Sequence, residues 1–284
     1  MPSNPATLTA GPRAPALGDL RYLLFQQVTA AGFFQDQAIA TGILGLNTYY
    51  LNPGLGTPPE IGYGACVPGV AQDCGWRFLV YTLPAGQTGL SMHYASDSYS
   101  NFSSDMQSLA APDLVIDSLD LEPANNIFCV SFVKTVQTGG FDYRLQIVPP
   151  DQLQTTVAND GAASRIVTAV SFDANNQANV ISYGWTGDTT TVYKAQTVIA
   201  QPSDVASQAE ALAANGYFIS AFGGNDTDGY MLIGMRVMGD TLARPIFAST
   251  PSGSSSSMPQ SPPYPTQVLD FGISGGPNIT AWEQ

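Results

Sequence analysis

A single histidine is the first residue of this chain that could perform acid–base chemistry. His93, in "GLSMHYASD", lies close in sequence to Ser91, Ser96 and Asp97. A histidine that deprotonates a serine is the arrangement used in nucleophilic hydrolysis. The simpler interpretation is an ordinary surface or half-buried histidine beside Met and Tyr. Hydrolysis through His93 is therefore kept only as an alternative function.

A run of carboxylates offers a second possibility for hydrolysis. The segment "DLVIDSLDLE" contains Asp113, Asp117, Asp120 and Glu122. In a strand, Asp120 and Glu122 share one face and Asp117 points to the other. Paired carboxylates cleave glycosides when they stand about 5 to 9 Å apart across a substrate. A solvated strand face explains the same pattern without any chemistry.

Other motifs of this kind fit their patterns poorly. The segment "GGNDTDGY" has the Asp226, Asp228 and Gly229 of a calcium loop, but it lacks the first acidic position and the closing Glu. It predicts a hairpin turn instead. The segment "GISGG" matches Gly-x-Ser-x-Gly, yet the chain after it is too short for a helix and for the remaining catalytic residues. With one histidine and no Cys-x-x-Cys, we expect no metal site and no cofactor.

Cysteines and aromatic residues suggest two further features. Cys66 and Cys74 bracket "CVPGVAQDC", a loop that a disulfide could close, although two unlinked thiols remain the alternative. Cys129 is expected to be a small buried residue on a strand. Four aromatic residues could form a platform for sugar rings or a peptide, or could simply pack against a sheet. They are Tyr183, Trp185, Tyr193 and Tyr217.

The composition indicates a folded protein with an unusual surface. Of 284 residues, 44% are hydrophobic and only 11% are charged, against roughly 25% charged in an average globular protein. The two lysines are Lys134 and Lys194. A surface of hydroxyl and amide groups suits extracellular, cell-surface, periplasmic or virion proteins that pack against copies of themselves.

Charge excludes some partners. The net charge is −13 and no cluster of Lys and Arg occurs, so binding to nucleic acid or to an anionic membrane is not expected. The first residues lack the basic start and apolar core of a secretory signal, which was either removed or never present. The longest apolar stretch near the start is too short to span a bilayer.

Repetition predicts the fold. The segment "TVYKAQTVIA" reads as a strand, "PSDVASQAEALAANG" as a helix that ends at Asn215-Gly216, and "YFISAFG" and "YMLIGMRV" as two strands joined by a turn. The preceding segment has the same order, from "FDYRLQIV" to "NVISYGW". We therefore expect an α+β protein of strand-helix-strand-strand repeats, with antiparallel sheets, helices on one face and pseudo-symmetry.

Earlier copies of the unit are less regular. One is expected to begin with the strand "WRFLVYTLP", followed by a Ser-rich insertion, the helix "NFSSDMQSLA" and the strands "DLVIDSLDL" and "IFCVSFVKT". A partial copy would start at "RYLLFQQV", with "GFFQDQAIATGILGL" as its helix. The resulting organisation is a tail (1–19), a partial unit and loop (20–75), three repeats (76–250), a Ser/Pro linker (251–266) and a final strand (267–284).

The final strand bears on function. In "QVLDFGISGG", Leu269, Phe271 and Ile273 alternate as in a strand, which either folds back onto its own sheet or completes the sheet of a neighbouring copy. With the low charge, this predicts a non-enzymatic structural subunit of an extracellular, surface or virion assembly, with copies of itself as partners. The alternative is a secreted or periplasmic module that binds glycans or peptides, and the second alternative is the hydrolase.

Overall fold

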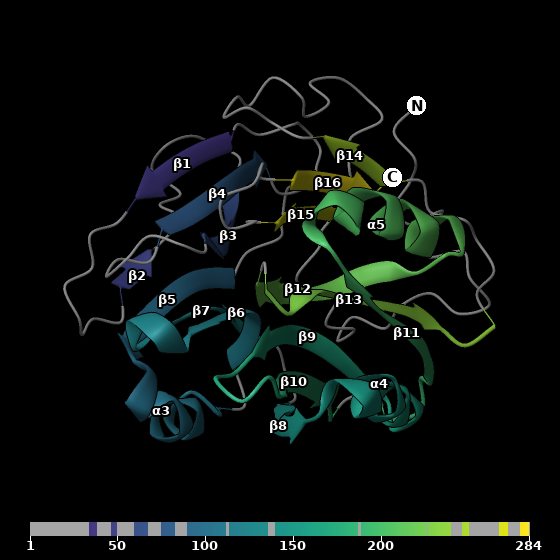
Figure 1. Cartoon of the computed structure of the whole chain (residues 1–284), viewed down its shortest axis with the longest axis horizontal. Helices are drawn as coiled ribbons and strands as arrows, with labels where there is room; N and C mark the ends of the chain where they lie inside the picture. The colour runs from purple at the N-terminus through teal and green to yellow at the C-terminus, as the bar shows by residue number, and fades with distance from the viewer. Residues whose placement is uncertain are drawn as a thin grey trace.

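The computed structural model describes most of the central part of the chain and several separate strands near its two ends. The described residues are 34–38, 47–49, 60–67, 75–82, 90–111, 114–135, 140–186, 189–225, 227–239, 246–249, 267–271 and 279–283. Within them the fold is mixed α+β, with five antiparallel sheets (Figure 1). The α+β class expected from the sequence is confirmed.

The bounds of the elements are as follows. The strands are β1 (Phe34–Ala38), β2 (Asn47–Tyr49), β3 (Glu60–Val67), β4 (Gly75–Thr82), β5 (Leu90–Ser98), β6 (Leu114–Glu122), β7 (Ile127–Thr135), β8 (Phe141–Val148), β9 (Arg165–Phe172), β10 (Ala178–Trp185), β11 (Tyr193–Ala200), β12 (Phe218–Asn225), β13 (Gly229–Val237), β14 (Ile246–Ser249), β15 (Gln267–Phe271) and β16 (Ile279–Glu283). The helices are α3 (Phe102–Ser108), α4 (Leu153–Ala162) and α5 (Val205–Ala214). Single 3-10 turns are η2 (Tyr99–Asn101), η3 (Pro123–Asn125), η4 (Pro150–Gln152) and η5 (Pro202–Asp204).

Four of the described sheets share one three-stranded order, and the fifth contains the same order with β2 added at its edge. Their orders are β1-β4-β3, β2-β5-β7-β6, β8-β10-β9, β11-β13-β12 and β14-β16-β15. In each, the last strand of a group of three lies in the middle and pairs antiparallel with both of the others. The first strands from β5 onward begin at Leu90, Phe141, Tyr193 and Ile246, at a nearly constant interval.

Local sequence accounts for the helices and turns of the two central sheets. Pro150 and Pro202 open the 3-10 turns that lead into α4 and α5, where a missing N–H costs nothing. Helix α5 ends before Asn215, and Gly216 has a φ of 80°, which glycine adopts without strain. The predicted strands, helices and turns of these two segments are confirmed.

Two earlier assignments are wrong. Residues Phe34–Ala38 were expected in a helix, but they form β1, paired with β4. The strand at Gly75–Thr82 was expected to lead the unit that contains α3, yet it is the middle strand of the β1-β4-β3 sheet. The true leading strand is β5, Leu90–Ser98, in the segment that was expected to be an insertion. Its serines do not suggest a strand, but it pairs with β7 along its whole length, and such long-range pairing overrides local propensity.

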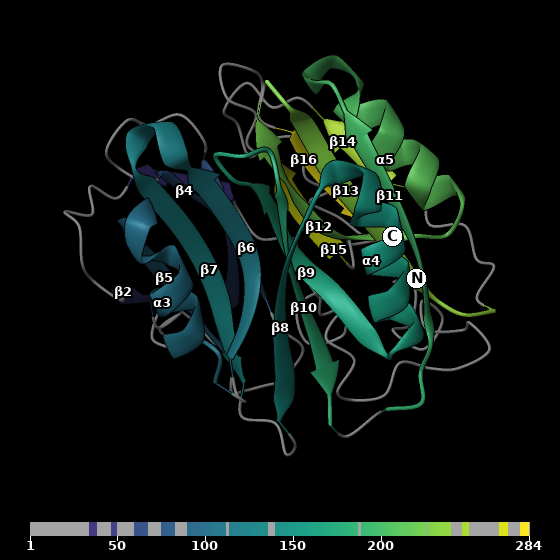
Figure 2. The same cartoon turned by 60° about the horizontal axis from the view of Figure 1, so that its bottom comes forward.

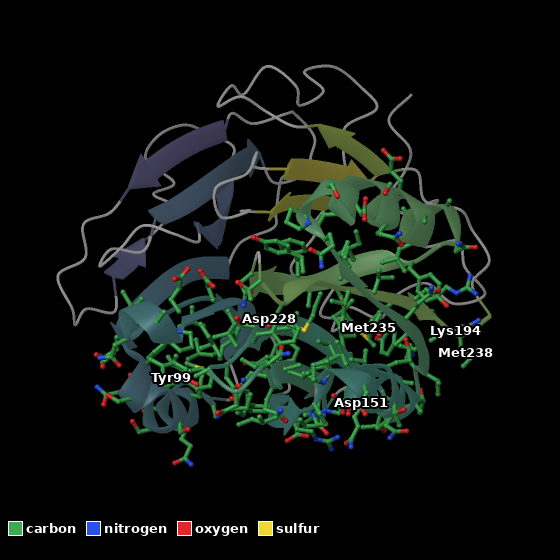
Figure 3. All side chains as sticks on the ribbon, in the orientation of Figure 1. Tyr99, Asp151, Lys194, Asp228, Met235 and Met238 are labelled. Atoms are coloured by element: carbon green, nitrogen blue, oxygen red, sulfur yellow. The ribbon has the colours of Figure 1, made fainter. Side chains whose placement is uncertain are left out.

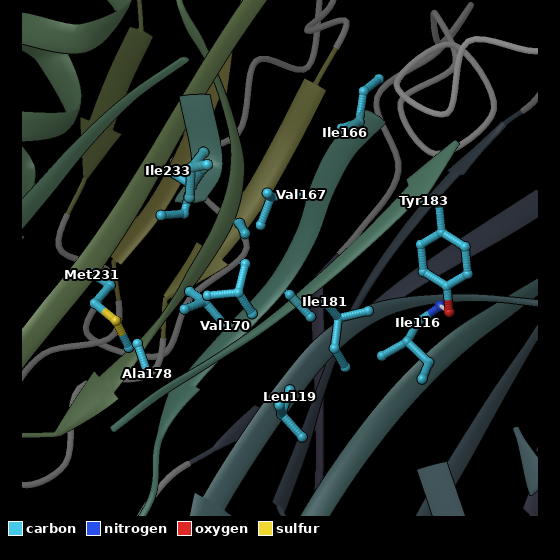
Figure 4. Close-up of a cluster of buried hydrophobic side chains, with 14 of the residues drawn as sticks. Ile116, Leu119, Ile166, Val167, Val170, Ala178, Ile181, Tyr183, Met231 and Ile233 are labelled. Carbon is cyan, nitrogen blue, oxygen red and sulfur yellow. Dashed lines mark hydrogen bonds between the residues drawn. The ribbon is translucent and has the colours of Figure 1, made fainter. Parts of the chain in front are cut away.

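The innermost strands contact one another and form the centre of the molecule. Strand β9 lies against both β6 and β12, and β3 and β15 contact each other as well as β6 and β12 respectively. Figure 4 shows the buried side chains at this centre, including Ile116, Val170 and Ile181, all fully buried. Backbones meet closely here: a Cβ placed on Gly223 would stand 1.7 Å from the carbonyl oxygen of Val170.

Three of these inner strands have an irregularity at a corresponding place. The ladder skips Asp117 between Ile116 and Ser118 in β6, Thr168 in β9 and Ser220 in β12. An extra residue of this kind is a β-bulge, which bends a strand and increases its twist. The bulge at Asp117 also breaks the simple alternation expected for the carboxylates of this strand.

Candidate interaction surface

The outer edge of β8 has backbone groups available for a further strand. Thr186 N donates to Gly140 O at 3.0 Å, which identifies that pair as hydrogen-bonded. Hydrogen-bonded and non-hydrogen-bonded pairs alternate along an antiparallel ladder. The register of β8 with β10 therefore directs the N–H and C=O groups of Tyr143 and Leu145 away from the sheet. Within the described residues, no hydrogen bond from another element reaches these groups.

The corresponding edge of β11 is covered. Here Met238 N donates to Val192 O, so the pair of Val192 and Met238 is hydrogen-bonded. The alternation along the ladder then directs the N–H and C=O groups of Ala195 and Thr197 away from the sheet. Gln154 of α4 binds both: its Nε2 donates to Ala195 O at 3.2 Å, and its Oε1 accepts from Thr197 N at 2.8 Å. One side-chain amide thus replaces a neighbouring strand at β11.

An apolar row follows the open edge of β8. Phe141, Tyr143, Leu145 and Ile147 alternate with polar residues, and they become more exposed along the strand. Phe141 is buried, Tyr143 and Leu145 are half-buried, and Ile147 is 54% exposed. Strand β8 lies at the lower rim of Figure 1 and comes to the front in Figure 2. Exposed unpaired strands with apolar residues are the usual sites of strand addition.

Polar residues on the other face of β8 hold the strand in place. The carboxylate of Asp160, buried on α4, accepts from Arg144 Nη1 at 2.8 Å and from Gln146 Nε2 at 2.9 Å. Asp142 is bound by Arg165, which lies on β9 and is itself buried. Arg165 Nη2 also donates to Asp142 O at 2.6 Å and to Ser182 O on β10 at 2.9 Å. This guanidinium therefore links all three strands, and the edge is rigidly positioned.

Two polar atoms beside this edge are buried and have no hydrogen-bond partner among the residues that the structure describes. They are the hydroxyl of Tyr143 and Nε1 of Trp185. Burial raises the pKa of Tyr143 to about 12, so its hydroxyl is protonated at neutral pH. Tyr143 pairs across the ladder with Tyr183, and their rings meet edge to face with centroids 5.6 Å apart.

The four aromatic residues considered for ligand binding lie in the interior or half-buried. Tyr183 is fully buried, and its hydroxyl accepts a hydrogen bond from Ile116 N at 2.9 Å (Figure 4). Tyr193 is buried and Trp185 is half-buried, both in the same core as Tyr183. Tyr217 belongs to a second core under α5, with the guanidinium of Arg236 4.8 Å from its ring centre. These rings contact protein, and the structure does not bring all four together.

Among the carboxylates, Asp120 has the most perturbed environment. Burial, together with the nearby charge of Glu122, raises the pKa of Asp120 to about 7. Leu119 and Leu121 point into the core, so Asp120 and Glu122, both half-buried, lie on the opposite face of β6. Asp117 is the bulged residue of the strand, and Asp113 lies outside the described residues.

Other residues of interest take structural positions or are only partly described. His93 lies on β5, opposite Thr48 and Phe132. Asp97 is the penultimate residue of the same strand and accepts from Ser98 N and Asn101 Nδ2. For the cysteine pair, only the backbone of Cys66, on β3, is described, and Cys74 lies outside the described residues.

Two of the three residues singled out in the C-terminal strand lie in a described strand. Leu269 and Phe271 belong to β15, which pairs with β16 of the same chain. Ile273 lies outside the described residues. Strand β16 also pairs with β14.

The segment around Asp228 forms the hairpin turn that its sequence predicts. Asn225 Oδ1 accepts from Thr227 N and Asp228 N, and Asn225 Nδ2 donates to Asp228 Oδ2. In the described part of the chain, no group of three potential metal-binding side chains comes together. None of the helices described is long and apolar enough to cross a bilayer.

Sequence reasoning missed the open edge of β8 and the glutamine that covers β11. The two strands, "FDYRLQIV" and "YKAQTVIA", have nearly the same pattern, and each has an isoleucine as its seventh residue. The difference arises from the elements that pack beside each strand.

Two methionines near the end of β13 lie in different surroundings. Met238, 54% exposed, lies at the rim near Lys194, whereas Met235 lies in the interior (Figure 3).

Comparison with known proteins adds no relative. No protein-family model, no curated protein and no solved structure matches this chain. Its function is therefore argued from its own geometry.

Proposed function

We propose that the protein is a non-enzymatic structural subunit of an extracellular, surface or virion assembly, joined to neighbouring chains through the outer edge of β8. The observation that carries this proposal is the contrast between two similar strands. The edge of β11 is covered by Gln154, while no hydrogen bond from the described part of the chain reaches the outward backbone groups of β8, whose Ile147 is 54% exposed. An open apolar edge favours pairing with another chain.

The composition supports the same proposal. With 11% charged residues and two lysines, much of the surface consists of uncharged hydroxyl and amide groups, which can pack against another copy without burying charges. The charged groups on β8 itself, Asp142 and Arg144, are bound to Arg165 and Asp160 of their own chain. This pairing reduces their repulsion of an incoming strand, except where two like groups would stand directly opposite each other.

Solution mass tests the proposal. Light scattering of the full chain across a wide concentration range should show a species heavier than the 29.9 kDa monomer, and its fraction should rise with concentration. A monomer at every concentration would contradict self-assembly.

We further propose that the chain is a pseudo-symmetric array of one repeated strand-helix-strand-strand unit, arranged around the contacts of its inner strands. Three observations support this: the shared strand order, the nearly constant interval between leading strands, and the bulges at Asp117, Thr168 and Ser220. An experimental structure in which the sheets superpose by successive equal rotations is the expected result. Unequal rotations would contradict it.

A second candidate function is hydrolysis through Asp120. It is favoured by one observation, the pKa of about 7, which suits a general acid at neutral pH. Glu122, whose charge contributes to the raised pKa of Asp120, lies on the same strand face and would be the second carboxylate. If the function is correct, a panel of glycosides and esters should include one substrate whose turnover is abolished by Asp120→Asn but retained in Asp151→Asn. Turnover absent from the whole panel, or unaffected by Asp120→Asn, would reject it.

A further inference from the structure

The open edge of β8 can pair with only certain registers of an identical strand. Because the outward groups belong to alternate residues, a two-fold axis between two antiparallel β8 strands must coincide with a residue and not fall between two residues; we compare the positions Tyr143, Arg144 and Leu145 near the middle of the strand. These three arrangements differ in which side chains face one another, and that difference allows a choice among them.

Two of the three registers are unfavourable. An axis at Arg144 places the two Arg144 guanidinium groups directly opposite each other, and like charges in that position destabilise a sheet. An axis at Tyr143 places Asp142 opposite Arg144, but both groups already have partners in their own chain. That register also leaves the exposed Ile147 beyond the end of the partner strand.

The remaining register is self-complementary. With the axis at Leu145, the two Leu145 side chains face each other, and each Ile147 faces Tyr143 of the other chain. Arg144 then faces Gln146, so no like charges meet. We propose that a second copy of this chain pairs with β8 in this antiparallel register; the inference rests on the proposed function and names the neighbour and the contact.

The interface should be weak unless other parts of the chain add to it. A stable interface buries about 1,600 Å² in total, which is more than one pair of strands of this length provides. The backbone hydrogen bonds between the two β8 strands would set their direction and register, and burial of the apolar row would supply the favourable free energy of association. Dimerisation is therefore expected to depend on concentration.

Cross-linking tests the register in the full chain. Opposite residues in a hydrogen-bonded antiparallel pair have Cα atoms about 5.5 Å apart, within the reach of a disulfide. Under mild oxidation, Leu145→Cys should form a covalent dimer, whereas Tyr143→Cys alone should form no more than the parent chain. An equal mixture of Tyr143→Cys and Ile147→Cys should form the mixed dimer.

Surface variants test the edge itself, with a matched control. Ile147→Lys should weaken dimerisation at least tenfold, as measured by light scattering. Ile199→Lys, at the corresponding place on the covered strand β11, should leave it unchanged. Circular dichroism establishes that each variant is folded, and the mixed-cysteine experiment replaces Leu145→Cys if that variant unfolds.

The outcomes separate this inference from the proposed function. If the parent chain is oligomeric, but Ile147→Lys has no effect and neither cysteine arrangement cross-links, the β8 contact is wrong while assembly stands. Cross-linking of Tyr143→Cys alone would overturn the register in favour of an axis at Tyr143. A parent chain that is monomeric throughout overturns both proposals.

Discussion

At the scale of single residues, two tyrosines that face each other across the β8–β10 ladder should respond differently to loss of their hydroxyl groups. Tyr183 accepts a hydrogen bond from Ile116 N in the core, whereas the hydroxyl of Tyr143 is buried without a partner. Removing a partner from a buried donor leaves its desolvation cost uncompensated, but removing an already unpaired group does not.

We therefore predict that Tyr183→Phe lowers the free energy of unfolding by about 1 to 3 kcal/mol. The matched variant Tyr143→Phe should be neutral or slightly stabilising. Urea denaturation of both variants measures the difference. Equal losses in the two variants would show that the hydroxyl of Tyr143 does have a partner in the folded protein.

The raised pKa of Asp120 predicts how the free energy of unfolding changes with pH. This pKa is about 7 in the folded protein, against an ordinary value of 3.8 for an aspartate side chain. Below about pH 4 the carboxyl is protonated in both states. Between about pH 4 and pH 7 the unfolded chain has lost this proton while the folded chain keeps it, so the stability of the fold decreases as the pH rises and levels off above about pH 7.

The variant Asp120→Asn removes this titration. Relative to the parent chain, it should be more stable at pH 8 by on the order of 2 kcal/mol, and the gain should shrink toward pH 4. Denaturant unfolding at the two pH values measures it, with the exposed Asp151→Asn as control. A gain that is the same at both values would contradict the raised pKa.

At the scale of elements, helix α4 both covers a sheet and replaces a strand. Gln154 is exposed, and its amide oxygen accepts from both the backbone N–H and the hydroxyl of Thr197. The same helix also approaches β11 closely at Gly161, where a Cβ would stand 2.6 Å from Tyr193 O. The edge of β11 is thus closed by a helix and one side chain.

We predict that Gln154→Ala opens this edge. The amide of Thr197 should exchange its hydrogen faster, and stability should fall by about 1 kcal/mol. Hydrogen exchange followed by mass spectrometry or NMR measures the first effect. The neighbouring exposed Thr155→Ala should change neither quantity, and unaltered exchange at Thr197 in Gln154→Ala would contradict the role of this glutamine.

At the scale of the whole molecule, contact between adjacent sheets depends on a glycine. Gly223 of β12 lies against the backbone of Val170 on β9, where there is no space for a Cβ. Backbone atoms on both sides prevent relief by a change of rotamer, so any larger residue must push the two sheets apart.

Accordingly, Gly223→Ala should destabilise the protein by about 3 kcal/mol or more. Gly184→Ala provides the comparison, since its Cβ would meet the side chain of Arg165 at 3.3 Å rather than backbone, and its cost should be nearer 1 kcal/mol. Thermal or urea unfolding distinguishes them. Equal losses of stability in the two variants would indicate that the two sheets can move apart at Gly223 without a cost in free energy.

Several helices, strands and turns could be predicted from the sequence, because their formation depends on residues close to one another in the chain. The helices α4 and α5 begin after Pro150 and Pro202, the hairpin turn at Asn225 has the residue types that such turns require, and Gly216 ends its helix. Alternation of apolar residues gave the strands of both central sheets. Each of these features depends on backbone preferences within a few residues, so neighbouring residues suffice to predict it.

The formation of β5 and the exposure of the β8 edge depend on contacts between distant parts of the chain, and they became evident from the tertiary structure. Strand β5 contains serines and a histidine that do not suggest a strand, and it forms because β7 lies beside it. Likewise β8 and β11 have nearly the same pattern, yet Gln154 covers one edge and the other stays open. Exposure of an edge depends on which element packs against it, and that element can be far away in sequence. The candidate interaction surface therefore could not be found from the sequence alone.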